Sequence, residues 1–188
     1  QKTYEATIQL GESTDTLDHT GTVLESKAVP DFTKDEIQIL MNSFLGKTKQ
    51  IPPMYSAIKI DGQRLYKMAR QGKEVQREPR DIEIFDLQIL EWSKPVLKFK
   101  ATVSRGTYIR VLAEDIAQKL NTLGHLIELK RTILCQNDLK KAFSFDQSED
   151  DLEKVKISIS DLLTHIPALE IEANKQILNG HSIQVSDP

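Results

Sequence analysis

The sequence predicts an α+β fold in which helices flank a mixed, largely antiparallel sheet. Apolar and polar residues alternate with period two over residues 4–10, 81–92 and 96–104, which is typical of half-buried strands. Apolar residues recur at helical spacing over 37–45 and 109–120. These strand-like and helix-like stretches do not alternate regularly, as they would in a parallel β-α-β sheet.

The N-terminal part begins with an expected strand over residues 4–10, which Gly11 ends. Residues 12–21 are polar and rich in threonine and aspartate, which favours a loop. Extended structure is expected to resume at residue 22 and to continue as far as Pro30.

A helix is predicted to follow. Thr33 and Glu36 have the spacing of a capping box, in which each side chain satisfies a backbone N–H of the other residue. Gly46 suits the position just after the last helical residue. The apolar face consists of Ile37, Leu40, Met41, Phe44 and Leu45.

Residues 47–80 form a strongly basic segment, called the basic insert below. Its nine bases and three acids give a charge of +6, although the whole chain is at −3. Local charge governs phosphate binding better than the sum over the chain, so the basic insert is a candidate nucleic-acid surface. The bases are Lys47, Lys49, Lys59, Arg64, Lys67, Arg70, Lys73, Arg77 and Arg80.

Within the basic insert, Pro52-Pro53 excludes a helix at the start. We expect a short strand over 56–60, a hairpin turn at Asp61-Gly62, and a short helix over 65–71 that Gly72 ends.

The second half of the chain predicts two strands, a helix and a third strand. In the strand at 96–104, four apolar residues face one side, namely Leu97, Phe99, Ala101 and Val103. Arg105-Gly106 forms the turn that leads toward the helix at 109–120, which is expected to end near Gly124. Residues 126–135 are apolar enough for a buried strand, with Cys135 as a small buried hydrophobe.

The tail predicts a linker into a second module. Ser160 is expected to cap a short helix over 161–165. We therefore divide the chain into a domain over 1–160 and the start of another over 161–188. Both ends of the sequence suggest a piece cut from a longer protein.

Composition excludes several classes of protein. No apolar run approaches the ~20 residues that a membrane span needs. A single cysteine cannot form an internal disulfide, which suits the reducing cytoplasm. The four histidines are dispersed, and Thr14-Asp15-Thr16-Leu17-Asp18 does not fit a calcium loop, so we expect turn-stabilising hydrogen bonds there and no metal.

Two positions have a structural and a functional interpretation. Tyr4 is either a core residue or a platform on which a nucleobase stacks. Arg110 lies among apolar neighbours near a predicted helix start, so it is either a surface arginine or one paired with a carboxylate or phosphate.

A set of strings in the chain resembles the bacterial TruB-type pseudouridine synthases. These strings occur in the family's order over about 130 residues. They are residues 4–11, 14–21, Gln50-Ile51-Pro52-Pro53-Met54-Tyr55-Ser56-Ala57-Ile58-Lys59, Tyr66, 69–72, 77–80, Arg105-Gly106-Thr107-Tyr108-Ile109-Arg110, 124–126 and 129–132.

The resemblance implies roles for individual residues. Tyr4 matches the active-site tyrosine, Arg110 matches the arginine paired with the catalytic aspartate, and Tyr108 and Leu129 match residues that line the target-base pocket. The basic insert matches a clamp for the tRNA T arm, for which we single out Lys59, Arg64, Tyr66 and Arg70. Residues 161–188 resemble the linker into a C-terminal RNA-binding domain of the PUA type and the start of that domain. The implied reaction converts uridine 55 to pseudouridine without a cofactor.

The family's nucleophilic aspartate stands in a G-x-L-D-x-x-A-x-G string that these 188 residues do not contain. We therefore expect an inactive piece of a monomeric cytoplasmic enzyme, unless a separate chain supplies the missing segment. On this hypothesis Arg110 faces a carboxylate from outside the chain. The alternatives are a non-catalytic tRNA- or RNA-binding module and a soluble α+β interaction domain.

Overall fold

The computed structural model describes residues 1–60, 62–135, 137–143, 156–158 and 161. The chain divides into two units, Gln1–Lys141 and Ala142–Pro188. Most of the second unit, including nearly all of the helix expected over 161–165, lies outside the described residues.

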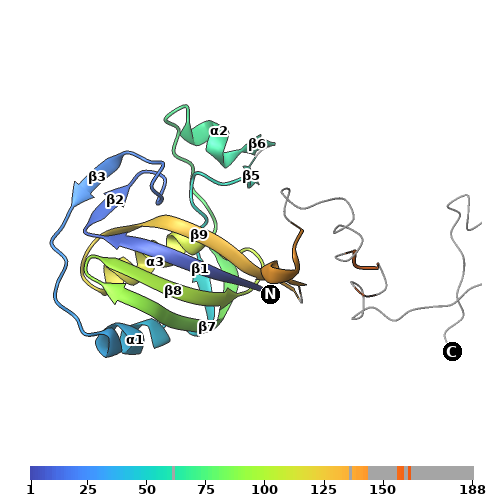
Figure 1. Cartoon of the computed structure of the whole chain (residues 1–188). Helices are drawn as coiled ribbons and strands as arrows, with labels where there is room; N and C mark the ends of the chain where they lie inside the picture. Colours follow the sequence, from blue (N-terminus) through green and yellow to red (C-terminus); the bar gives the residue numbers. More distant parts are fainter. Residues whose placement is uncertain (61, 136, 144–155, 159–160, 162–188) are drawn as a thin grey trace, which may run out of the picture. The chain divides into compact units, whose positions relative to one another are not determined.

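The first unit is organised around a six-stranded sheet with strand order β10-β9-β1-β8-β7-β4 (Figure 1). Each neighbouring pair of strands is antiparallel, and the predicted fold class is confirmed. The strands are β1 Lys2–Leu10, β4 Gly46–Gln50, β7 Arg80–Ser93, β8 Val96–Val103, β9 Gly124–Leu134 and β10 Asn137–Asp138.

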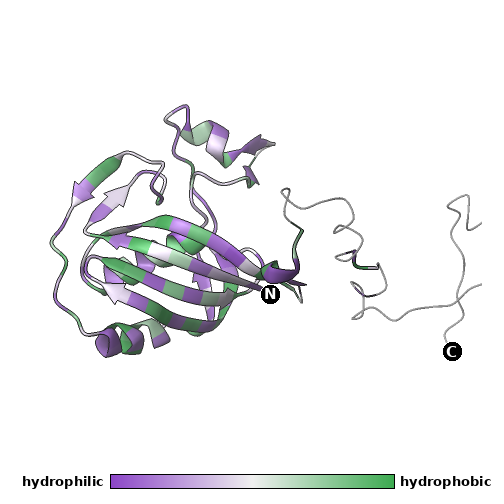
Figure 2. Ribbon diagram, viewed as in Figure 1, coloured by the Kyte–Doolittle hydropathy of each residue, from purple (hydrophilic) through white to green (hydrophobic). Residues whose placement is uncertain are grey.

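One face of this sheet carries the hydrophobic core. In the antiparallel register Ala6 lies opposite Phe99 and Ile8 opposite Leu97, so their side chains share a face. The predicted apolar side of β8 is buried at all four positions. Figure 2 shows the resulting alternation of apolar and polar residues along the strands.

Helix α3, Ile109–Lys119, covers the core face of the sheet. It ends earlier than predicted, and Gly124 instead opens β9. A Cβ atom built on Gly124 would lie 2.7 Å from the Cβ atom of Ala117, so this glycine permits the close approach of helix and strand.

Helix α1, Lys34–Asn42, begins with the predicted capping box: the Thr33 N–H donates to Glu36 Oε2 at 2.7 Å, and the Glu36 N–H to Thr33 Oγ1 at 3.3 Å. The predicted helix end at Gly46 is wrong. Ser43 is the C-cap, while Gly46, with φ of 98°, opens β4.

The remaining elements are short. They are β2 Glu12–Thr14, β3 Val23–Ser26, β5 Lys59–Ile60, β6 Gln63–Arg64, α2 Leu65–Ala69 and the 3-10 turn Leu139–Lys141. The basic insert begins in β4 and ends at the first residue of β7. Between these strands it projects from the sheet and carries β5, β6 and α2 at its far end (Figure 1).

Two expectations for the strand predicted over 126–135 are wrong. Only the first three residues of β9 are buried, and the other eight are exposed or partly exposed. Cys135 is exposed and has a positive φ of 56°, so it is not a core residue.

Candidate functional site

The guanidinium of Arg110 joins three segments of the chain. Arg110 lies in the first turn of α3, with its side chain 23% exposed. Its Nη1 donates to Asp18 Oδ2 at 2.8 Å and to the Thr16 carbonyl at 3.1 Å, and its Nη2 donates to the Tyr55 carbonyl at 2.7 Å. The loop before β3, the basic insert and α3 therefore meet at one side chain.

The expectation that the chain itself supplies no carboxylate for Arg110 is wrong. Asp18 is one such carboxylate, although it lies 92 residues away in the sequence. Its side chain is 20% exposed, so the ion pair is largely shielded from water. A shielded, charge-assisted pair is stronger than an exposed one.

The loop around Asp18 is built to hold a carboxylate. Asp18 Oδ1 accepts hydrogen bonds from Thr16 Oγ1, the Thr20 N–H and Thr20 Oγ1 at 2.9, 3.1 and 2.5 Å. Burial acts to raise the pKa of Asp18, but the hydrogen bonds from Thr20 and Thr16 and the charge of Arg110 together hold that pKa below its ordinary value. Asp18 is thus an anion at neutral pH.

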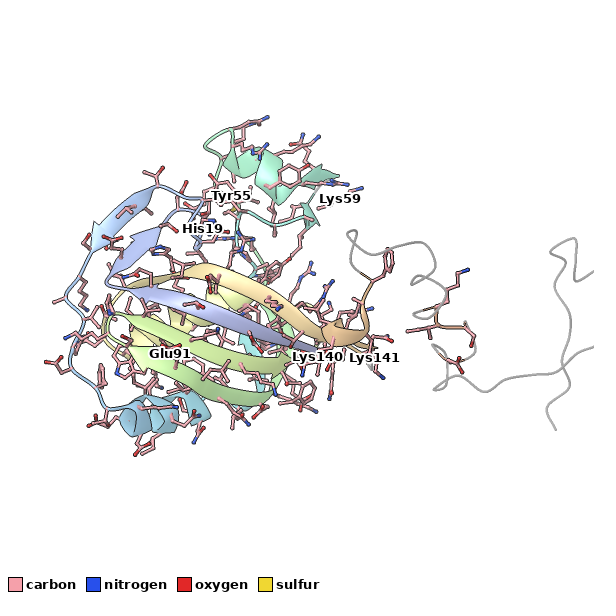
Figure 3. All side chains as sticks on the ribbon, in the orientation of Figure 1. His19, Tyr55, Lys59, Glu91, Lys140 and Lys141 are labelled. Atoms are coloured by element: carbon pink, nitrogen blue, oxygen red, sulfur yellow. The ribbon has the colours of Figure 1, made fainter. Side chains whose placement is uncertain are left out.

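Close packing inside this loop explains its glycine. A Cβ atom on Gly21 would collide with the side chains of Asp15 and Thr16. The predicted turn-stabilising threonine and aspartate hydrogen bonds are confirmed. The Tyr55 hydroxyl donates to Asp15 Oδ2 at 3.4 Å, which adds a second contact between this loop and the basic insert. In the view of Figure 3, Tyr55 and His19 both lie beyond the β9 edge of the sheet.

Tyr4 and Leu129 share the face of the sheet on which α3 lies. Ala6 pairs with Leu129 across β1 and β9, and Tyr4 stands two residues before Ala6, so the three side chains lie on one face. Tyr4 is partly buried and packs against the core, whereas Leu129 is 48% exposed. Tyr108 is the N-cap residue of α3 and also partly buried.

The loop of Asp18 also connects Arg110 to β9. The backbone of Asp18 bridges that of Leu126, three residues before Leu129. The structure thus brings Arg110, the Asp18 loop and β9 together.

The four residues singled out in the basic insert lie at its far end. Lys59, Arg64 and Arg70 are exposed, and Lys59 and Arg64 line a surface pocket of about 580 Å³. Arg70 lies 5.7 Å from the centre of the Tyr66 ring, and Arg64 Nη1 donates to the Tyr66 hydroxyl at 3.5 Å. The hydrogen bond from Arg64 and the surrounding positive charge lower the pKa of Tyr66.

Within the described residues, no group of three or more potential ligands stands at metal-binding distance. The same part of the chain has no helix that is long and apolar enough to cross a membrane.

Residues 1–109 match the N-terminal domain of the TruB family of pseudouridylate synthases. The chain belongs to this family. It is 41% identical over 177 residues to the tRNA pseudouridine synthase B of Geobacter sulfurreducens, covering 92% of this chain and 58% of that protein. It is 38% identical over 195 residues to that of Oceanobacillus iheyensis, covering 98% and 64%.

A third relative, the tRNA pseudouridine synthase B of Opitutus terrae, is 44% identical over 148 residues, which cover 79% of this chain and 61% of the relative. The chain thus spans about three fifths of the length of these curated relatives. Among solved structures, a chain of a Cbf5-Nop10-Gar1 complex gives a TM-score of 0.48 at 26% identity and covers 70% of this chain and 30% of its own length.

Proposed function

We propose that this chain is part of a tRNA pseudouridine synthase that converts uridine 55 of the T loop to pseudouridine. The membership of the TruB family and the relatives named tRNA pseudouridine synthase B support the reaction class. The structural observation that carries the proposal is the meeting of three segments at Arg110, because it links the basic insert to the face where Tyr4 and Leu129 lie.

In this proposal each part of the chain has a separate task. The target uridine leaves the T-loop stack at an unstacking cost of a few kcal/mol and lies against Tyr4, Tyr108 and Leu129. A nucleophilic aspartate from outside these 188 residues attacks C1′ of the ribose, and the glycosidic bond from C1′ to N1 of uracil breaks. The uracil then turns, and its C5 atom bonds to C1′ and releases the aspartate. C5 loses its proton and N1 gains one, so the reaction is an isomerisation. Arg110, held by Asp18, favours the ionised form of that aspartate. No cofactor takes part.

The basic insert supplies the contacts with the T arm. Among the described residues, which omit Asp61, the bases at its far end have no ion-pair partner, so they are available to phosphates. Tyr66 and Arg70 offer flat faces to unpaired bases. We place the enzyme in the cytoplasm as a monomer.

Binding of a T-arm hairpin tests the proposed substrate. Affinity should fall steeply with salt, and Arg64→Gln or Arg70→Gln should each reduce the salt slope by about 1 and weaken binding. Lys94→Gln is the control, because Lys94 lies outside the basic insert and pairs with Asp31. Equal binding of a hairpin with a scrambled loop, or a binding constant that is independent of salt, would contradict the proposal.

A second candidate function is RNA binding without chemistry. It is favoured by the +6 charge of the basic insert. Incubation of the 188-residue polypeptide with the hairpin, followed by chemical detection of pseudouridine, should give no product. Turnover by this polypeptide would show that the nucleophile lies within the sequence.

A further inference from the structure

Gln50 makes a two-point contact with the backbone of Tyr108, 58 residues away. The Tyr108 N–H donates to Gln50 Oε1 at 2.8 Å, and Gln50 Nε2 donates to the Tyr108 carbonyl at 3.2 Å. Gln50 is only 5% exposed. The side chain therefore pairs with Tyr108 as a neighbouring strand would.

The chemistry of this contact requires a carboxamide. Tyr108 presents one donor and one acceptor, and a carboxamide offers one of each in one plane. A carboxylate at position 50 would keep the bond from the N–H and set an oxygen against the Tyr108 carbonyl. A shorter or apolar side chain would leave buried backbone groups without this partner.

Tyr108 needs an outside partner because it begins a helix. It is the N-cap of α3, its backbone is extended, and its side chain makes no capping hydrogen bond. Its carbonyl already accepts the first helical hydrogen bond, from the Leu112 N–H at 3.1 Å. Gln50 satisfies the Tyr108 N–H. Its two hydrogen bonds also fix the peptide planes on both sides of the Tyr108 Cα atom, from which the side chain projects.

Gln50 also stands where β4 ends and the non-helical part of the basic insert begins. Five residues later, the Tyr55 carbonyl accepts from Arg110. The root of the insert and the start of α3 are thus tied together on both sides of Ile109, through Tyr108 and through Arg110.

We propose that Gln50 is a positioning residue that sets Tyr108 against the target base and couples this part of the site to the root of the basic insert. The inference rests on the proposed function, in which Tyr108 lines the base pocket. Gln50 touches no reacting atom and acts through the Tyr108 backbone.

Gln38 provides a matched control. Its Nε2 donates to the Leu87 carbonyl at 2.9 Å, and its Oε1 accepts from the Ile89 N–H at 2.8 Å. This contact has the same chemistry as that of Gln50, but it fastens α1 to β7. Substitution at position 38 therefore reproduces the structural loss without involving Tyr108.

The first experiment measures amide hydrogen exchange in the free 188-residue protein. Gln50→Ala should speed exchange of the Tyr108 amide by at least about tenfold, because the amide loses its acceptor. Gln38→Ala should speed exchange at Ile89 and leave Tyr108 unchanged. Unchanged exchange at Tyr108 in Gln50→Ala would overturn the contact itself.

The second experiment separates overall binding from engagement of the base. A T-arm hairpin carries a fluorescent pyrimidine at the target position; anisotropy reports binding and emission intensity reports base stacking. Gln50→Glu should leave the affinity derived from anisotropy within about twofold of the unsubstituted value. It should reduce about tenfold the ratio of complexes in which the base is engaged to complexes in which the base stays in the loop. Gln38→Glu should change neither signal, even if both variants lose the same thermal stability.

The outcomes separate this inference from the proposed function. If the unsubstituted protein does not bind the hairpin, the proposed substrate is wrong, and so is the role of Gln50 at the base. The exchange experiment still tests the contact between Gln50 and Tyr108 in that case. If the unsubstituted protein engages the base and Gln50→Glu behaves like Gln38→Glu, the positioning role alone is overturned.

Discussion

The ion pair between Asp18 and Arg110 gives the sharpest test of how this fold is held together. Asp18→Asn keeps the shape of the side chain and the oxygen that accepts from Thr16 and Thr20. It places an NH₂ group, a donor, against Arg110 Nη1, where Oδ2 now accepts at 2.8 Å. The variant thus removes one charge and one charge-assisted hydrogen bond without creating a cavity.

The size of the effect follows from burial. Full burial of an arginine whose partner is removed costs about 3–5 kcal/mol. Here the two side chains are 23% and 20% exposed, and Arg110 keeps its two backbone carbonyl acceptors. We therefore expect Asp18→Asn to lower the free energy of unfolding by about 2–3 kcal/mol. This is the upper part of the range for a hydrogen bond to a charged group, and it lies below the range for a fully buried pair.

Urea unfolding followed by fluorescence of the single tryptophan, Trp92, measures this loss. Asp31→Asn is the matched control, because Asp31 pairs with Lys94 but is 95% exposed. Its loss should be below about 1 kcal/mol. The pKa of Asp18 is lower in the folded than in the unfolded protein. Its ionised form therefore contributes to the free energy of unfolding above the ordinary aspartate pKa, and this contribution fades as pH falls through the folded pKa. Equal losses in the two variants at neutral pH would refute the reasoning.

Two further predictions concern α3. Gly124→Ala should lower the free energy of unfolding by about 1–3 kcal/mol, measured in the same urea titration, because its Cβ atom would overlap that of Ala117. Burial raises the pKa of Glu114, as does the charge of Asp115, and burial also raises the pKa of Asp115. Because the folded state disfavours the ionised Glu114, Glu114→Gln should be more stable than the unsubstituted protein at neutral pH. That advantage should vanish when the pH falls below the ordinary glutamate pKa, and its persistence there would contradict the interpretation.

Local patterns in the sequence were sufficient for much of the fold. The alternation over 96–104 predicts the buried face of β8, since one face of a strand is read directly from every second residue. The capping box at Thr33 and Glu36 is equally local, and its hydrogen bonds are present as predicted. In both cases the physical cause lies within a few residues of its effect.

The partner of Arg110 could not be predicted in this way. The local pattern at Arg110 indicates only that some anion should face it. Asp18 becomes that anion because the loop after β2 pairs through its backbone with Leu126 of β9. Gln50 presents the same difficulty, since its contact with Tyr108 depends on where β4 ends relative to α3. The burial expected for Cys135 failed because apolar composition does not show where a strand ends: β9 ends at Leu134, and Cys135 follows it with a positive φ of 56°.

The contacts of the root of the basic insert limit how the insert can move in the proposed complex with RNA. Arg77 Nη1 donates to the Pro52 carbonyl, Arg110 Nη2 donates to the Tyr55 carbonyl, and Gln50 pairs with Tyr108. A pivot before Tyr55 would break at least one hydrogen bond to a charged guanidinium, at a cost of about 1.5–3 kcal/mol. A pivot beyond Tyr55 leaves these three contacts intact. In the proposed complex, adaptation to the T arm should therefore be confined to the end of the insert that carries β5, β6 and α2, while the root keeps its contacts with Arg110 and Tyr108.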